Sequence, residues 1–172
     1  MIVPILLYGS QMLRRNTSDV VEEDRPGEIS RNMFETLKRA EGIGLAGPQV
    51  AISKKIFIID TTPMHGGDPY FKAVEKVFLN PQIVEIEEEE VAFNEGCLSI
   101  PGIFSELQRP DKIYVKYQNL AFETVEEELQ GLEARIFQHE YDHLDGILFI
   151  DHMSGLQKRL IQGKLKKIKK RR

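Results

Sequence analysis

The segment Gln138–Gly146, QHEYDHLDG, restricts the fold of this chain more than any other stretch, because two of its histidines can share one ion only on a helix. His139 and His143 are four residues apart, which places their side chains one turn apart on the same face of an α-helix. Glu140 projects beside them, and a carboxylate next to a metal-bound water can take its proton and later return it. The spacing therefore predicts a helix that carries a catalytic metal site.

The third protein ligand of this site does not follow the pattern of the zinc peptidases. Those enzymes complete the site downstream, either with a further histidine or with a glutamate. Position 149, where that histidine would stand, is Phe149, and no Asp or Glu follows Asp151. The remaining candidates for the third ligand are Cys97, His65, His152 and a nearby aspartate.

Cys97 is the only cysteine, which excludes an internal disulfide and suits a reducing compartment. It stands in Glu95–Ser99, EGCLS, where the adjacent Gly96 lets the backbone approach an ion closely. A thiolate near a cation binds soft or borderline metals, and two imidazoles with one thiolate leave a fourth position for water. A cysteine taken alone is more often a small buried apolar residue, but the sequence context of Cys97 favours the metal ligand.

Apolar periodicity and the positions of Gly and Pro predict three helices. These helices cover Ser30–Ala40, which ends near Gly42, then Leu132–His143, and Ser154–Ile168. The last is amphipathic, with one apolar side made of Leu156, Leu160, Ile161, Leu165 and Ile168.

Short β-rich runs predict strands between these helices. The strands are Lys55–Asp60, Lys76–Glu87 with a bend at Asn80-Pro81, and a hairpin made of Lys112–Tyr117 and Ala121–Leu129. Thr61–Asp68 contains Pro and Gly and is typical of a surface loop. The order of elements predicts one α+β domain over residues 1–172, with mixed, mainly antiparallel strands packed around the central HExxH helix.

Charge is distributed unevenly along the chain. The formal net charge is −4, but Lys164–Arg172 holds seven of the Lys and Arg residues, and the remaining 16 oppose 27 Asp and Glu, a balance of −11. Such an acidic body repels nucleic acid, so any attraction to phosphate must come from this tail. The tail can equally be a frayed, solubilising helix end. The apolar start of the chain is short and interrupted by Pro4, and no run is long enough to span a membrane, so we expect a cytoplasmic protein.

Three blocks of sequence, in this order, resemble the three motifs of the peptide deformylases: GIGLAGPQ at Gly42–Gln49, EGCLS at Glu95–Ser99 and QHEYDHL at Gln138–Leu144. The resemblance implies that Cys97, His139 and His143 hold one divalent ion. In that family the ion is usually Fe²⁺ in the cell, and Ni²⁺, Co²⁺ or Zn²⁺ can replace it. The resemblance also implies removal of the N-formyl group from the initiator methionine of new polypeptides.

The same resemblance implies roles for individual residues. Glu140 would be the general acid and base, while Gln49 and the backbone N–H of Leu98 would bind the oxygen of the tetrahedral intermediate. Glu95 would pair with Arg109 and support the cysteine loop.

The resemblance also implies a substrate pocket. Ile43 and Ile136 would form apolar walls for the methionine side chain, and Gly44 and Gly96 would let the backbone come close to the peptide. Two other classes remain as alternatives: a metallopeptidase that cuts internal peptide bonds, and a noncatalytic ribosome-binding module with a structural metal.

Three further features bear on the resemblance. Position 47 is Gly where the family usually has Ala, which predicts a less firmly held Gln49 and predicts that Gly47→Ala changes activity by only a few-fold. Residues Thr61–Lys72 resemble a surface insertion. Because some family members dock on ribosomes through a C-terminal helix, Lys164–Arg172 would contact ribosomal RNA.

Overall fold

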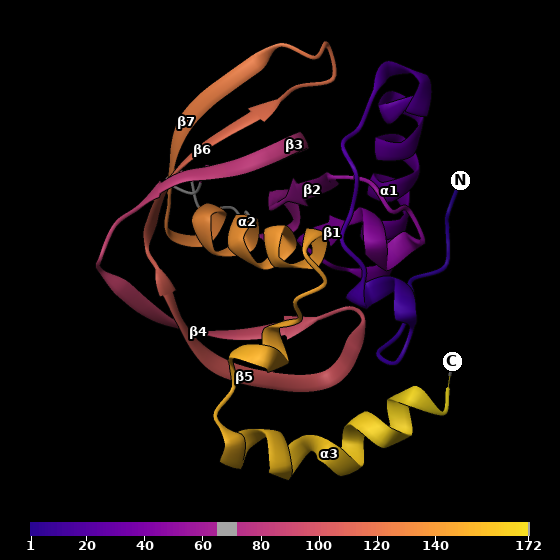
Figure 1. The fold of residues 1–172 in the computed structure, drawn as a ribbon, viewed down its shortest axis with the longest axis vertical. Helices are drawn as coiled ribbons and strands as arrows, with labels where there is room; N and C mark the ends of the chain where they lie inside the picture. Colours follow the sequence, from indigo (N-terminus) through magenta and orange to yellow (C-terminus); the bar gives the residue numbers. More distant parts are fainter. Residues whose placement is uncertain (65–71, 172) are drawn as a thin grey trace.

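The computed structural model describes residues 1–64 and 72–171, which contain three α-helices, seven strands and five short 3₁₀-helices (Figure 1). The α-helices are α1 (Pro26–Ala40), α2 (Gly131–Leu144) and α3 (Gly155–Lys169). The strands are β1 (Gly44–Ala46), β2 (Ile56–Asp60), β3 (Glu75–Ile86), β4 (Glu90–Cys97), β5 (Ile100–Pro110), β6 (Lys112–Gln118) and β7 (Thr124–Gln130). The 3₁₀-helices are η1 (Gln11–Arg14), η2 (Glu22–Asp24), η3 (Gly47–Val50), η4 (Thr62–Met64) and η5 (Phe149–His152). The predicted α+β class is confirmed.

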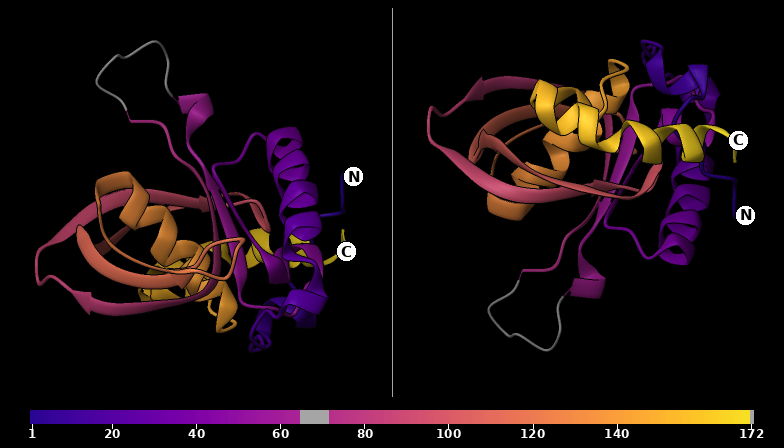
Figure 2. Two further views of the ribbon diagram at one scale, coloured as in Figure 1. Left: turned by 90° about the horizontal axis from the view of Figure 1, so that it is seen from above. Right: turned by 90° about the horizontal axis from the view of Figure 1, so that it is seen from below.

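Five strands form one antiparallel sheet in the order β1-β2-β3-β6-β7, and helices cover both of its faces (Figures 1 and 2). Strand β2 shows why its sequence is continuously apolar. Phe57 and Ile59 lie in the cluster formed with α2, whereas Ile56 and Ile58 lie in the cluster formed with α1. Because successive side chains of a strand point to opposite faces, a strand covered on both faces needs apolar residues at every position.

Strands β4 and β5 form a separate antiparallel hairpin, and α2 lies between it and the larger sheet (Figure 1). Helix α3 packs on the outer side of β5, where Leu165 and Ile168 join Ile103 and Leu107 in a third apolar cluster. The helix that carries His139 and His143 is therefore enclosed between the two sheets.

Several predicted elements are confirmed, with shifted ends. The bend predicted at Asn80-Pro81 is a change of register between Leu79 and Gln82, where Asn80 takes a φ of 50°. Helix α1 begins at Pro26 rather than Ser30, because the ring of proline already fixes a helical φ in the first turn.

The hairpin β4–β5 was not predicted. Along β5 the buried positions alternate, as expected for a strand with one covered face, and they are Ile103, Ser105, Leu107 and Arg109. Two of these four side chains are polar, so the sequence has no apolar alternation to detect. Because polar side chains occupy inward positions, the hydrophobic pattern of the sequence did not indicate this strand.

The apolar side predicted for α3 is only partly correct. Leu165 and Ile168 are buried, but Leu156 is 68% exposed and Leu160 is 75% exposed. Only the C-terminal half of the helix is anchored in the apolar cluster that it shares with β5. Ser154 caps the other end, where its Oγ accepts a hydrogen bond from the N–H of Gln157. The helix continues into the basic segment as far as Lys169.

The predicted loop after β2 begins with η4, and its remainder, including the candidate ligand His65, lies outside the described residues. Within the described part of the chain, no helix is long and apolar enough to cross a bilayer.

Candidate metal and catalytic centre

Helix α2 places His139, Glu140 and His143 on the side that faces the cysteine. The two imidazole rings lie 5.2 Å apart between their centroids. His143 is 1% exposed and Glu140 is 4% exposed, so both are buried between the two sheets. Burial lowers the pKa of His143, which keeps its imidazole neutral, the form that can bind a metal.

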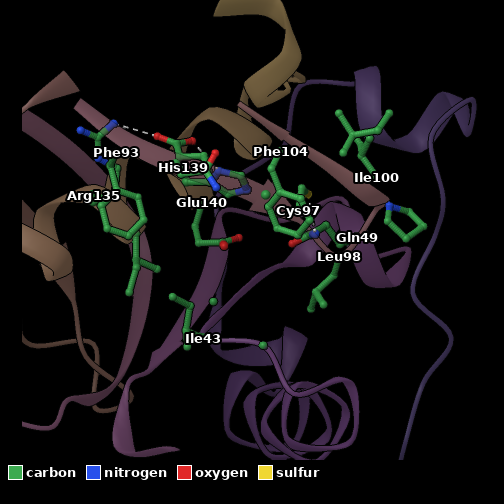
Figure 3. Close-up of a pocket in the computed structure, with 18 of the residues that line it drawn as sticks. Ile43, Gln49, Phe93, Cys97, Leu98, Ile100, Phe104, Arg135, His139 and Glu140 are labelled. Carbon is green, nitrogen blue, oxygen red and sulfur yellow. Dashed lines mark hydrogen bonds and ion pairs between the residues drawn. The ribbon is translucent and has the colours of Figure 1, made fainter. Parts of the chain in front are cut away.

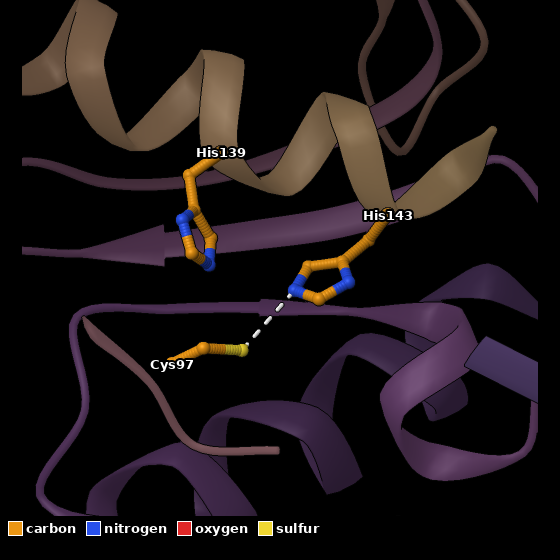
Figure 4. Close-up of side chains that lie close together, drawn as sticks. All are labelled: Cys97, His139 and His143. Carbon is orange, nitrogen blue, oxygen red and sulfur yellow. Dashed lines mark hydrogen bonds between the residues drawn. The ribbon is translucent and has the colours of Figure 1, made fainter. Parts of the chain in front are cut away.

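Cys97, the last residue of β4, completes a cluster with the two histidines (Figure 4). Its Sγ lies 3.4 Å from Nε2 of His143, and the three potential ligand atoms all lie within 4.8 Å of one another. Among residues 1–64 and 72–171, this is the only group of three such side chains with metal-binding spacing. His152 is not part of it: its Nε2 lies 2.8 Å from Oδ2 of Asp142 instead.

The chemistry of these donors fits a divalent transition metal. A thiolate and two imidazoles suit ions such as iron, cobalt, nickel and zinc. Nδ1 of His139 is hydrogen-bonded to Glu95, so Nε2 of that ring is the nitrogen on the side of the cluster. A carboxylate partner of this kind fixes the orientation of a histidine ligand and raises its basicity.

Glu95 holds the hairpin and the helix together. Its carboxylate accepts hydrogen bonds from Arg109 at 2.6 and 3.1 Å and from Arg135 at 2.9 Å, and lies 3.0 Å from Nδ1 of His139. Burial by itself would raise the pKa of Glu95, but the hydrogen bonds from His139 and Arg109 outweigh it and lower that pKa well below its usual range. The group therefore stays a carboxylate. The predicted pair of Glu95 with Arg109 is present.

Two members of this network were missed in the sequence. Arg135 donates to Glu95 and to the carbonyl oxygen of Leu107, and Asp142 accepts from Nη1 of Arg109 at 2.9 Å. A signal was available for Arg135, because it stands four residues before His139 and thus on the same helix face. No local signal identifies Asp142, since its partners come from β5 and η5.

Glu140 is held in an unusual environment. Its Oε2 is buried and has no hydrogen-bond partner among the described residues, and burial raises its pKa to about 7. Gly44 in β1 makes room for it, because a Cβ at that position would lie 2.5 Å from Oε1 of Glu140. A carboxyl group with a pKa near neutrality can both accept and donate a proton.

Gln49 lies in η3 and is 1% exposed. The N–H of Ala46 donates to Oε1 of Gln49 at 2.8 Å, which directs Nε2 toward Oγ of Ser99 at 3.1 Å and Sγ of Cys97 at 3.5 Å. The fully buried Ser99, which the sequence did not single out, fixes this amide from the other side.

The expectation that Gly47 loosens this loop does not agree with the geometry. A Cβ on Gly47 would lie 2.8 Å from the carbonyl oxygen of Ile52 and 3.0 Å from that of Lys54. The loop is closed by a hydrogen bond of 2.9 Å from the N–H of Ile52 to the oxygen of Gly47. The glycine thus permits a tight backbone contact that an alanine would disturb, whereas the few-fold effect of Gly47→Ala on activity stays a prediction.

Cys97, His139 and Glu140 line a cleft with a volume of about 410 Å³ (Figure 3). Apolar side chains form most of its wall, with Ile43, Leu98 and Ile136 among them. Gly44 and Gly96 also line the cleft, and Leu98 follows Cys97 in the turn between β4 and β5. The residues expected to bind substrate therefore surround one cleft together with Cys97 and His139, two of the three expected metal ligands.

Comparison with known proteins gives one consistent result. Residues 2–159 match the family model described as polypeptide deformylase. The chain is 42% identical to the peptide deformylase of Cytophaga hutchinsonii over 99% of this chain and 92% of that protein. It is 43% identical to the peptide deformylase of Thermotoga maritima over 94% and 93% of the two chains. The crystal structure of peptide deformylase from Thermus thermophilus superposes with a TM-score of 0.90 at 34% identity, over 100% of both chains.

Proposed function

The chain belongs to the polypeptide deformylase family, metal-dependent hydrolases that remove the N-formyl group of new polypeptides, and we propose that Glu140 is its general acid and base. The observation that carries this assignment is the buried Oε2 of Glu140, which has no hydrogen-bond partner among the described residues and lies beside the cysteine and the two histidines. The protein is thus an enzyme that releases formate. What we propose is the catalytic role of each residue in its site.

The metal would be held by Cys97, His139 and His143, with Fe²⁺ as the ion in the cell and Ni²⁺, Co²⁺ or Zn²⁺ as possible replacements. Support comes from the one-thiolate, two-imidazole donor set and from the carboxylate of Glu95 behind His139. When bound, such an ion supplies Lewis acidity that lowers the pKa of water and polarises the formyl carbonyl.

Glu140 would take a proton from the attacking water as the new C–O bond forms at the formyl carbon. The same group would then give a proton to the methionine nitrogen as the C–N bond breaks, which releases formate and a free amine. A pKa of about 7 suits both transfers near neutral pH.

Gln49 Nε2 and the backbone N–H of Leu98 would donate hydrogen bonds to the formyl oxygen while it gains negative charge. Fixed donors of this kind contribute about 3–4 kcal/mol to transition-state stabilisation in comparable sites. Gln49 suits the role because Ala46 and Ser99 immobilise its amide next to Sγ of Cys97.

The methionine side chain would lie against Ile43 and Ile136, with Gly44 and Gly96 allowing close approach of the peptide backbone. Both isoleucines line the cleft and belong to, or pack against, the apolar cluster under α2. An apolar wall suits a thioether side chain.

Formate release from formyl-Met-Ala-Ser, measured beside a casein digest, tests the proposed function against the metallopeptidase alternative. We expect formate and no casein cleavage. Glu140→Gln should lower formate release by about 10²–10⁴-fold while bound metal stays at the parental level. Exposed Glu128→Gln on β7 is the matched control and should leave both unchanged. Casein cleavage without formate, or full activity in Glu140→Gln, would contradict the assignment.

The basic segment Lys164–Arg172 would contact ribosomal RNA, which would bring the enzyme to emerging chains. Support comes from α3, whose Leu165 and Ile168 are buried while its lysines are exposed. Lys164→Gln/Lys167→Gln should weaken ribosome pelleting and reduce the slope of log K against log salt by about 2 if both contact phosphate. Lys38→Gln/Lys72→Gln removes the same charge elsewhere, and equal pelleting of the two double variants would exclude this contact. The cytoplasmic location remains a prediction.

A further inference from the structure

Phe104 is the most exposed of the large apolar side chains that line the cleft in the described part of the chain. Its side chain is 65% exposed, compared with 42% for Phe93, whereas Ile100, Ile103 and Ile136 are nearly fully buried. An aromatic ring left in water forgoes much of the free energy that burial would provide. A cleft that displays such a ring has an apolar surface available for a ligand.

The position of the ring relative to the metal ligands is set by the hairpin register. Phe104 stands directly opposite Gly96, the residue before Cys97. A Cβ on Gly96 would lie 2.5 Å from Cε1 and 2.7 Å from Cδ1 of Phe104, so the ring packs closely against the glycine backbone. In Figure 3 Phe104 lies on the side of Cys97, while Phe93 lies near Arg135. The ring thus packs on the residue that directly precedes Cys97, the proposed metal ligand.

The position of Phe104 beside Gly96 determines which part of a bound peptide could reach the ring. An extended chain advances about 3.3–3.6 Å per residue. If the formyl carbon is at the metal cluster and the methionine side chain is among Ile43 and Ile136, the next part of the peptide runs past the neighbours of Cys97. Phe93 is less suitable as a contact, because the guanidinium of Arg135 already lies 5.7 Å from its ring centroid.

We propose that Phe104 is a specificity-determining residue that contacts the side chain following the formylmethionine and favours an apolar residue there. This inference rests on the proposed function of the cleft. An apolar side chain placed on the exposed part of the ring removes apolar area from water on both partners, whereas alanine covers little of it. Contact with one leucine side chain corresponds to about a five- to tenfold preference in kcat/KM.

A purely structural role is the competing explanation. An aromatic residue opposite a glycine can stabilise a hairpin by covering the exposed backbone of that glycine. In that case, removal of the ring would lower stability, metal content or turnover to the same extent for every substrate. The two explanations therefore predict different ratios of kcat/KM for two substrates, whereas a lower absolute rate would fit either of them.

The experiment compares kcat/KM for formyl-Met-Leu-Ser and formyl-Met-Ala-Ser in the metal-loaded enzyme. The parent should prefer leucine about five- to tenfold, Phe104→Ala should reduce the ratio to about one, and Phe104→Leu should give an intermediate ratio. Val84→Ala is the matched control, because Val84 is also 65% exposed but lies on β3 outside the cleft lining, and it should keep the parental ratio.

An unchanged ratio in Phe104→Ala, or a parent without preference, would overturn the proposal while leaving the deformylase activity intact. Failure of the parent to release formate from either peptide would instead overturn the proposed function and this inference with it. If Phe104→Ala does not fold, the ratio in Phe104→Leu alone decides, because the leucine keeps an apolar cover over Gly96.

Discussion

Helix α2 and the hairpin β4–β5 face each other across the same site, but their sequences encode it differently. In α2 the residues His139, Glu140 and His143 fall within five positions, so the helical period alone brings them together. In the hairpin, Glu95 and Arg109 meet only because the two strands pair, with Glu95 opposite Ser105 and Val91 opposite Arg109. Local spacing therefore reveals the contribution of a helix, whereas the contribution of a hairpin depends on pairings that only the fold establishes.

The largest expected effect comes from the hairpin. Cys97→Ala removes the only thiolate of the cluster, so we expect loss of bound metal together with loss of formate release. Metal content by atomic absorption and formate release measured on the same preparation check this outcome. Glu140→Gln on the helix is the counterpart that should keep its metal. Stoichiometric iron in Cys97→Ala would assign the third ligand to another residue.

A second hairpin variant tests whether cross-strand pairing stabilises the site. Arg109→Met removes a buried cation from Glu95 and Asp142, and breaking a buried ion pair lowers the free energy of unfolding by about 3 kcal/mol. Urea denaturation at equal metal loading measures the change. Lys116→Met, which removes an exposed pair with Glu126, should cost less than about 1 kcal/mol. Equal losses in the two variants would show that the buried network adds no stability.

The fold was largely predictable where one face of an element is apolar, and much less so where polar groups turn inward. The HExxH helix follows from the absence of Gly and Pro in Leu132–His143 and from its apolar periodicity. Strand β5 escaped detection because Ser105 and Arg109 occupy inward positions. The candidate ligands were open to sequence reasoning, but Arg135, Asp142 and Ser99 act through contacts between elements far apart in the chain.

Gly44→Ala tests the helix side of the comparison without changing α2 itself. The added Cβ would overlap Oε1 of Glu140, and a displacement of about 1 Å in a catalytic group can lower turnover by about a hundredfold. Steady-state formate release should show this loss in kcat, while metal content stays unchanged. Gly27→Ala, where nothing lies within 4 Å of the new methyl group, should retain parental turnover. Parental kcat in Gly44→Ala would mean that Glu140 does not need its present position.

The smallest effect concerns the loop that presents Gln49 between these two regions. Gly47→Ala forces a methyl group against two carbonyl oxygens, and overpacking of this kind costs about 1–2 kcal/mol. Thermal or urea unfolding should show the loss, and Gly155→Ala, with open space around its Cβ position, is the control. An unchanged free energy of unfolding would show that the loop accommodates the methyl group without strain.

The carboxylate of Glu95 also has a consequence for metal exchange. Because Arg109, Arg135 and His139 all bond to it, the strand that ends in the cysteine and the helix with both histidines are joined through protein groups. Zinc fingers, by contrast, fold only when their ion binds. We therefore expect that a chelator inactivates this enzyme reversibly without unfolding it. One preparation could then be reloaded with each candidate ion in turn, so that turnover is compared between metals on an identical scaffold.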